Sequence, residues 1–178
     1  MRPAAVVELA LLVGLAGCPG RTSTGTLELR WKGTERGVVT GSATGQWCDL
    51  LRLLEIRVVK GDTGVAVAIY PRNTLVAGTY PIRAPLKAES LPPAAAVALR
   101  WAGPTAVKGF QGESGNIVLE RSSGGAVSGR LTAAARSATD TGFLELTGQF
   151  RDLAVQSSKL GCVAGDTLDA PRTDTLVH

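Results

Sequence analysis

The chain has 178 residues, a length that fits one domain. Its composition is that of a globular protein, with 44% hydrophobic and 19% charged residues, and its 22 glycines favour short strands joined by tight turns. The net charge of +4 comes from basic residues spread along the chain, whereas a nucleic-acid surface needs a cluster of them, so we expect no nucleic-acid partner.

The first predicted element is a signal segment at residues 1–17. Arg2 supplies a basic start, and an apolar run at 9–15 follows it. This run is too short to span a bilayer permanently, which takes about 20 residues. It leads into Leu15-Ala16-Gly17-Cys18, four consecutive residues that resemble the lipobox of bacterial lipoproteins. Two features depart from that family's pattern: Glu8 interrupts the apolar run, and the start has a single basic residue.

The resemblance implies that the protein is exported and is attached to a membrane by lipid. In bacterial lipoproteins a peptidase cuts before the cysteine, whose thiol carries a diacylglyceryl group, so Cys18 is the expected lipidation site. Residues 18–25 then form a lipidated N-terminus and tether, and several acyl chains hold a protein stably on a membrane. Pro19 stands where an inner-membrane retention signal has Asp, which favours the outer membrane. The alternatives are an ordinary cleaved signal peptide with a coincidental cysteine, and a cytosolic protein.

Two cysteines remain once Cys18 carries lipid. In an oxidising exported compartment, Cys48 and Cys162 are candidates for a disulfide. Closing a loop of this length stabilises a fold by about 4–5 kcal/mol in the chain-entropy model. The alternative is a reactive thiol or a metal site, but neither cysteine lies in a CxxC motif and the only histidine is His178.

Strand patterns run through residues 26–163, the predicted single domain. Apolar and charged residues alternate at 27–31, and this period of two is typical of a half-buried strand. Residues 49–60 fit either a helical face or a strand, and we expect a strand for at least their second half. We expect a loop at 85–93. A short edge strand is expected around Pro81, since proline cannot donate to a central ladder.

In total, eight or nine short strands separated by turns predict an all-β fold, either an antiparallel β-sandwich or a β-barrel-like domain. A polar tail follows at 164–178. The stretch from Gly115 to Val155 also resembles segments of bacterial all-β envelope lipoproteins, a resemblance that implies no activity. A weak internal echo pairs residues 29–33 with 99–103, and either two related halves or chance agreement explains it.

The sequence lacks a convincing catalytic constellation, so we assign no catalytic, cofactor-binding or metal-binding residue and expect no cofactor. His178 ends a polar tail, and residues 112–115 have the wrong spacing for a nucleophile elbow. Trp31 and Trp101 fall on apolar strand faces, which favours core packing over a stacking platform for sugars or peptides. Acids on predicted strands fall on the solvent-facing side of each strand, which favours solvated charges over a pair of glycosidase acids. These acids are Glu28, Glu55, Glu120 and Glu145.

The expected function is that of a non-enzymatic envelope protein. Its lipid attaches it to the membrane, and its β domain supports or binds another envelope component. The alternatives are a β domain that captures a small apolar molecule or a glycan, and an enzyme of unrecognised type. A filled core with an exposed apolar patch favours the first class, a deep aromatic pocket the second, and acids clustered in a cleft the third.

Overall fold

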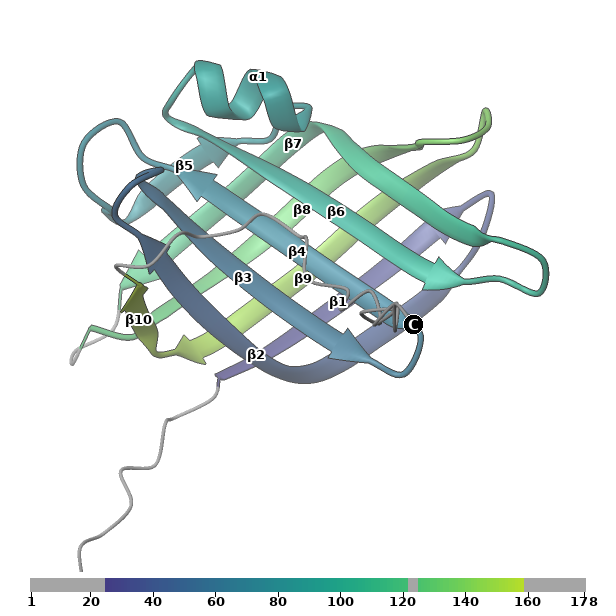
Figure 1. Cartoon of the computed structure of the whole chain (residues 1–178), viewed down its shortest axis with the longest axis horizontal. Coiled ribbons are helices and arrows are strands. Elements are labelled where there is room, and N and C mark those ends of the chain that lie inside the picture. The colour runs from purple at the N-terminus through teal and green to yellow at the C-terminus, as the bar shows by residue number, and fades with distance from the viewer. Residues whose placement is uncertain (1–24, 122–124, 159–178) are drawn as a thin grey trace, which may run out of the picture.

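The computed structural model describes residues 25–121 and 125–158, which form ten strands and one short helix (Figure 1). The elements in chain order are β1 (Gly25–Gly33), β2 (Gly37–Cys48), β3 (Leu53–Lys60), β4 (Thr63–Tyr70), β5 (Gly78–Pro81), α1 (Pro85–Ser90), β6 (Ala94–Ala102), β7 (Val107–Arg121), β8 (Val127–Ser137), β9 (Phe143–Leu153) and β10 (Val155–Ser158).

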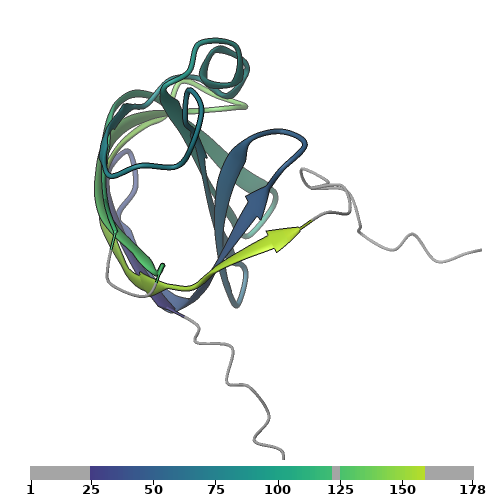
Figure 2. The same ribbon diagram turned by 90° about the vertical axis from the view of Figure 1, so that its left-hand side faces the viewer.

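Eight of the strands close into an antiparallel barrel, which Figure 2 shows turned by 90°. Strands β1, β2, β3, β4, β6, β7, β8 and β9 each pair with the next strand in this order. The barrel closes because β1 pairs with two strands at once: Leu27 lies opposite Gly41 of β2 and also opposite Phe150 of β9. The predicted all-β fold is confirmed, and of the two predicted architectures the structure is the barrel. Closure removes the unpaired edges that an open sheet exposes.

The two ends of the barrel differ. The hairpin end, on the right in Figure 1, carries the four short turns that join β1 to β2, β3 to β4, β6 to β7 and β8 to β9. The entry end, where β1 begins at Gly25, carries the connections 49–52, 71–77 and 82–93. Two short strands are added at this end: β5 pairs with the second half of β7, and β10 runs parallel to the last residues of β2.

Side chains along the long strands alternate between the interior and the outer face, as the period of two predicted. In β8, every second residue from Val127 to Ala135 is buried. Buried apolar side chains form one continuous cluster inside the barrel, and no polar or charged residue of the described segments falls in the buried class. The largest fully buried side chains are those of Phe150, Leu27, Leu29, Leu54, Ile56, Ile69, Leu99, Ile117, Leu119, Leu131, Leu144 and Leu146.

A helix, α1, packs on the outside of the barrel where the sequence predicted a loop (Figure 1). It has six residues, with Pro85 at its first position, where proline is tolerated. Its buried residue, Ala88, packs against Ala94 and Ala96 on the outer face of β6. Six residues are too few for an isolated helix in water. The loop prediction was therefore wrong because this tertiary contact, and not a local pattern, stabilises the helix.

The ambiguous segment 49–60 divides into a turn and a strand. Residues 49–52 form the turn after β2, with Arg52 at a positive φ of 50°. Strand β3 then pairs with β2 on one side and with β4 on the other. The expectation of a strand in the second half is confirmed.

Candidate functional site

Three aromatic rings fill the interior at the hairpin end. Trp31 of β1, Trp101 of β6 and Phe110 of β7 form a continuous stack against the core. The ring centroids of Trp31 and Trp101 are 5.5 Å apart, and those of Trp101 and Phe110 are 5.3 Å apart. Aromatic pairs at this spacing stabilise a fold beyond their buried area. The prediction of core packing is confirmed for Trp31, and Trp101 is partly buried and packs against the core. The two tryptophans of the sequence echo are in contact.

Trp31 occupies its position because its partner across the β1–β2 hairpin has no side chain. Trp31 lies opposite Gly37. A Cβ atom built on Gly37 meets three atoms of the Trp31 ring at less than 3.0 Å, so the ring lies directly over the glycine. Sequence reasoning missed this pair, and the signal for it was a tryptophan and a glycine placed opposite each other across a short turn.

Polar contacts tie the hairpins together beside the aromatic stack. Lys108 of β7 lies opposite Trp101, and its ammonium forms an ion pair with the carboxylate of Glu35 in the β1–β2 turn. These two hairpins lie on opposite sides of the barrel, because two strands separate them in either direction. The backbone N–H and the hydroxyl of Thr34 both donate to the carbonyl of Phe143, at 3.0 and 2.9 Å. The mouth at this end is therefore filled by rings and spanned by an ion pair.

Asp140 holds the turn between β8 and β9. The backbone N–H of Gly142 donates to Asp140 Oδ1 at 2.7 Å, and the N–H of Asp140 donates to Ser137 Oγ at 3.2 Å. The hydrogen bond from Gly142, followed by the interaction with Ser137, lowers the pKa of Asp140 below its ordinary value. These bonds lie within the turn itself, so we assign this carboxylate a structural role.

Four exposed apolar side chains surround the filled mouth, and we call them the apolar rim. They lie on the outward face near strand ends at the hairpin end: Val38, Val59, Val107 and Phe143. Val59 is 73% exposed and Val107 is 64% exposed. These two side chains line one hollow of about 190 Å³, whose lining also includes the charged residues Asp62 and Arg100.

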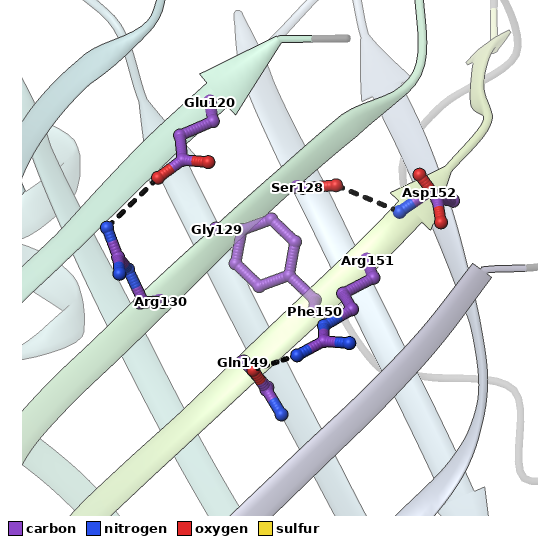
Figure 3. A pocket seen from close by; sticks show the side chains of 8 residues that line it. All are labelled: Glu120, Ser128, Gly129, Arg130, Gln149, Phe150, Arg151 and Asp152. Atoms are coloured by element: carbon purple, nitrogen blue, oxygen red, sulfur yellow. Dashed lines mark hydrogen bonds and ion pairs between the residues drawn. The ribbon is translucent and has the colours of Figure 1, made fainter.

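A second hollow, of about 410 Å³, lies on the outer wall of β7, β8 and β9 near the entry end (Figure 3). It is centred on Gly129, and the fully buried ring of Phe150 lies against this glycine, its cross-strand partner. The register shifts between Val127 and Gly129, which is the mark of a β-bulge. Beside the bulge, the N–H of Asp152 donates to Ser128 Oγ at 3.0 Å.

Three of the four charged side chains around this second hollow interact with neighbouring side chains (Figure 3). Arg130 donates to Glu120 at 3.1 Å, and Arg151 donates to Gln149 at 2.9 Å. The side chains of Arg130 and Glu120 are 72% and 57% exposed, so water screens their attraction. The lining is mainly polar, whereas small-molecule sites are lined mainly by apolar side chains.

The four candidate acids lie on four different strands of the outer wall. Each pairs with a nearby basic residue at a nitrogen-to-oxygen distance between 2.6 and 3.1 Å: Glu28 with Arg30, Glu55 with Arg57, Glu120 with Arg130, and Glu145 with Lys32. The side chains of Glu145 and Glu120 are 60% and 57% exposed, and exposed pairs of this kind contribute about 0–1 kcal/mol each. The interpretation as solvated strand charges agrees with the exposure of Glu120 and Glu145, whereas Glu28 and Glu55 are more covered, at 28% and 15% exposure.

The predicted cysteine sites lie partly outside the described residues. Cys18 and Cys162, with His178, fall outside residues 25–121 and 125–158. Cys48 ends β2, is 1% exposed and is disulfide-bonded. The lipidation of Cys18 and the pairing of Cys48 with Cys162 stay predictions.

Within the same two described segments, no group of three or more His, Cys, Asp or Glu side chains is placed to hold a metal ion. No helix there is long and apolar enough to cross a membrane. The chain matches no protein-family model, no curated protein and no solved structure.

Proposed function

We propose that this chain is a lipid-anchored protein of the bacterial cell envelope, attached through Cys18. Its barrel serves as a non-enzymatic domain that binds or supports another envelope protein. The anchor is supported by the basic start, the apolar run and the lipobox-like Leu15-Ala16-Gly17-Cys18.

The filled interior of the barrel carries the proposal for the domain. An eight-stranded barrel is just wide enough either to be filled by its own side chains or to hold one small ligand. Here one apolar cluster occupies the interior, and the stack of Trp31, Trp101 and Phe110 occupies the mouth at the hairpin end. Such a barrel acts through its surface, which favours a protein partner over the capture of a small molecule.

The apolar rim is the surface that we assign to the partner. Exposed apolar side chains lie at the hairpin end with charged ones beside them: Arg30 lies opposite Val38, and Asp62 and Arg100 line the same hollow as Val59 and Val107. Protein interfaces combine an apolar centre with a polar surround in this way. The rim also lies at the end opposite Gly25, so an N-terminal anchor leaves it accessible.

Two experiments on the full chain in its native membrane test this function. The first replaces Cys18 with serine: we expect the variant to lose its lipid mass and to leave the membrane fraction. A Cys18→Ser variant that keeps both would refute the anchor.

The second experiment places a photoreactive amino acid at Val59 and, as a matched control, at Thr132 on the exposed outer wall of β8. We expect a discrete protein adduct from position 59 only, and we expect the additional substitution Val107→Asp to weaken it. Equal adducts from both positions would contradict the assignment of the rim.

A further inference from the structure

We propose that the entry end of the barrel rests on the bilayer surface, with exposed leucines inserted between the lipid headgroups. This inference rests on the lipid anchor proposed above and adds an orientation to it. The partner that we assign to this surface is the phospholipid bilayer itself.

Exposed apolar side chains come from three separate segments of the entry end. Leu50 and Leu51 lie in the turn 49–52, Val76 lies in the loop 71–77, and Leu86 and Leu91 lie in and just after α1. Leu50 and Leu86 are each 82% exposed. Single exposed leucines need no explanation, but several from different segments at one end form a surface that an apolar partner can cover.

Each of these three segments also carries an exposed basic residue. Arg52 follows Leu51, Arg72 lies in the loop 71–77, and Lys87 follows Leu86. Lysine and arginine reach the headgroup region with their charge while their stems cover apolar surface. Anionic lipids attract such residues near the membrane surface.

Two acids lie in the same segments, and one of them accepts a hydrogen bond from another side chain. Asp49 accepts a hydrogen bond from Trp47 Nε1 at 2.7 Å. Glu89 of α1 lies close enough to Tyr70 on the barrel wall to raise the pKa of that phenol, after the larger effect of burial. We therefore expect the Asp49 carboxylate to oppose the approach of a bilayer less than a free carboxylate would. Glu89 is exposed, and the three basic residues of these segments outnumber the two acids.

The length of the tether selects this end of the barrel. Seven residues, Cys18 to Thr24, separate the predicted lipid from Gly25, where β1 begins at the entry end. Seven residues extend to at most about 25 Å. A lipid on Cys18 therefore keeps the entry end near the bilayer, whereas the apolar rim at the hairpin end lies a strand length farther away.

The three tryptophans provide natural probes of this orientation. Trp47 is partly buried near the entry end, beside the turn that carries Leu50. Trp31 and Trp101 lie in the aromatic stack at the hairpin end. A short-range quencher in the lipid therefore distinguishes the two ends without any added label.

The test uses the lipidated full chain in vesicles of phosphatidylethanolamine and phosphatidylglycerol, with and without brominated acyl chains. We expect brominated lipid to quench the part of the fluorescence that the Trp47→Phe variant lacks, and to leave the Trp31 and Trp101 emission unchanged. In Leu50→Asp/Leu51→Asp, this quenching should fall to that of vesicles without bromine, while the protein still floats with the vesicles. The matched control, Val59→Asp/Val107→Asp, carries the same charges at the hairpin end and should be quenched like the parent.

The outcomes separate this inference from the anchor on which it rests. A parent protein that does not float with vesicles refutes the anchor. A parent protein that floats but shows no quenching of Trp47, or equal quenching of all three tryptophans, overturns the orientation and leaves the anchor standing. An unchanged near-ultraviolet circular dichroism signal shows that each aspartate variant is folded. Should Leu50→Asp/Leu51→Asp unfold, Leu86→Asp tests the same surface on α1, and full quenching in that folded variant overturns the proposal.

Discussion

Because Trp31 packs on Gly37, we expect Gly37→Ala to change the free energy of unfolding in the direction opposite to most glycine-to-alanine substitutions in strands. Replacing glycine by alanine in a strand normally stabilises a protein by about 0.5–1 kcal/mol, because the unfolded chain loses freedom. At Gly37 the new methyl group meets three atoms of the Trp31 ring at less than 3.0 Å. Overpacking of this kind costs about 1–3 kcal/mol. We therefore expect Gly37→Ala to lower the free energy of unfolding by about 0.5–2 kcal/mol.

Gly109→Ala is the matched control, because a Cβ atom built on Gly109 in β7 meets nothing within 4 Å. We expect this variant to gain about 0.5–1 kcal/mol. Urea unfolding followed by far-ultraviolet circular dichroism measures both values. A smaller side chain in Trp31→Leu should remove most of the cost of Gly37→Ala, with a coupling energy of about 0.5–3 kcal/mol in a double-mutant cycle. The reasoning is refuted if Gly37→Ala is as stable as Gly109→Ala, or if its cost is the same with leucine at position 31.

Three further predictions follow from burial, titration and covalent bonding. Phe150→Ala should lower the free energy of unfolding by about 3–5 kcal/mol, because the ring is fully buried. The control Phe143→Ala, at a 56% exposed ring, should change it by less than about 0.5 kcal/mol in the same urea assay. Asp140 has a lowered pKa when folded, so its contribution is present above the ordinary carboxyl pKa of about 4 and is lost as the pH falls through the folded value. The stability difference between the parent and Asp140→Asn should therefore shrink on acidification, and a difference independent of pH would contradict this. Cys48→Ser should cost about 2–5 kcal/mol, and adding Cys162→Ser should cost little more if the two are partners; additive losses would argue against the pairing.

The local pattern of apolar and polar residues predicted most of the strands. The period of two at residues 27–31 sorts side chains into two faces without reference to any other part of the chain, and the structure buries one of these faces. The pattern failed at α1, because Ala88 gains its stability from Ala94 and Ala96 on the barrel wall. A six-residue helix carries too little local signal to be recognised.

The residues of the candidate surfaces were harder to predict than the strands. Sequence reasoning placed Trp31 and Trp101 in the core, but it did not bring them together, since seventy positions separate them and only closure of the barrel brings β1 and β6 around one interior. The ion pair between Glu35 and Lys108 was missed for the same reason. Neither the exposed leucines nor the apolar rim has a sequence signature, because the exposure of a side chain depends on which other parts of the folded chain cover it.

By itself, the sequence determined the all-β class and the inward and outward faces of the strands, because each of these depends on residues close together in the chain. The lipid site at Cys18 is a prediction of the same local kind. Only the tertiary structure decided that the sheet is a closed barrel and that its interior is full. Closure depends on the hydrogen bonds between β1 and β9, where Thr26 lies opposite Arg151. A strand presents the same alternating pattern whether its neighbour is near or far along the chain, so the identity of that neighbour is settled only when the whole chain folds.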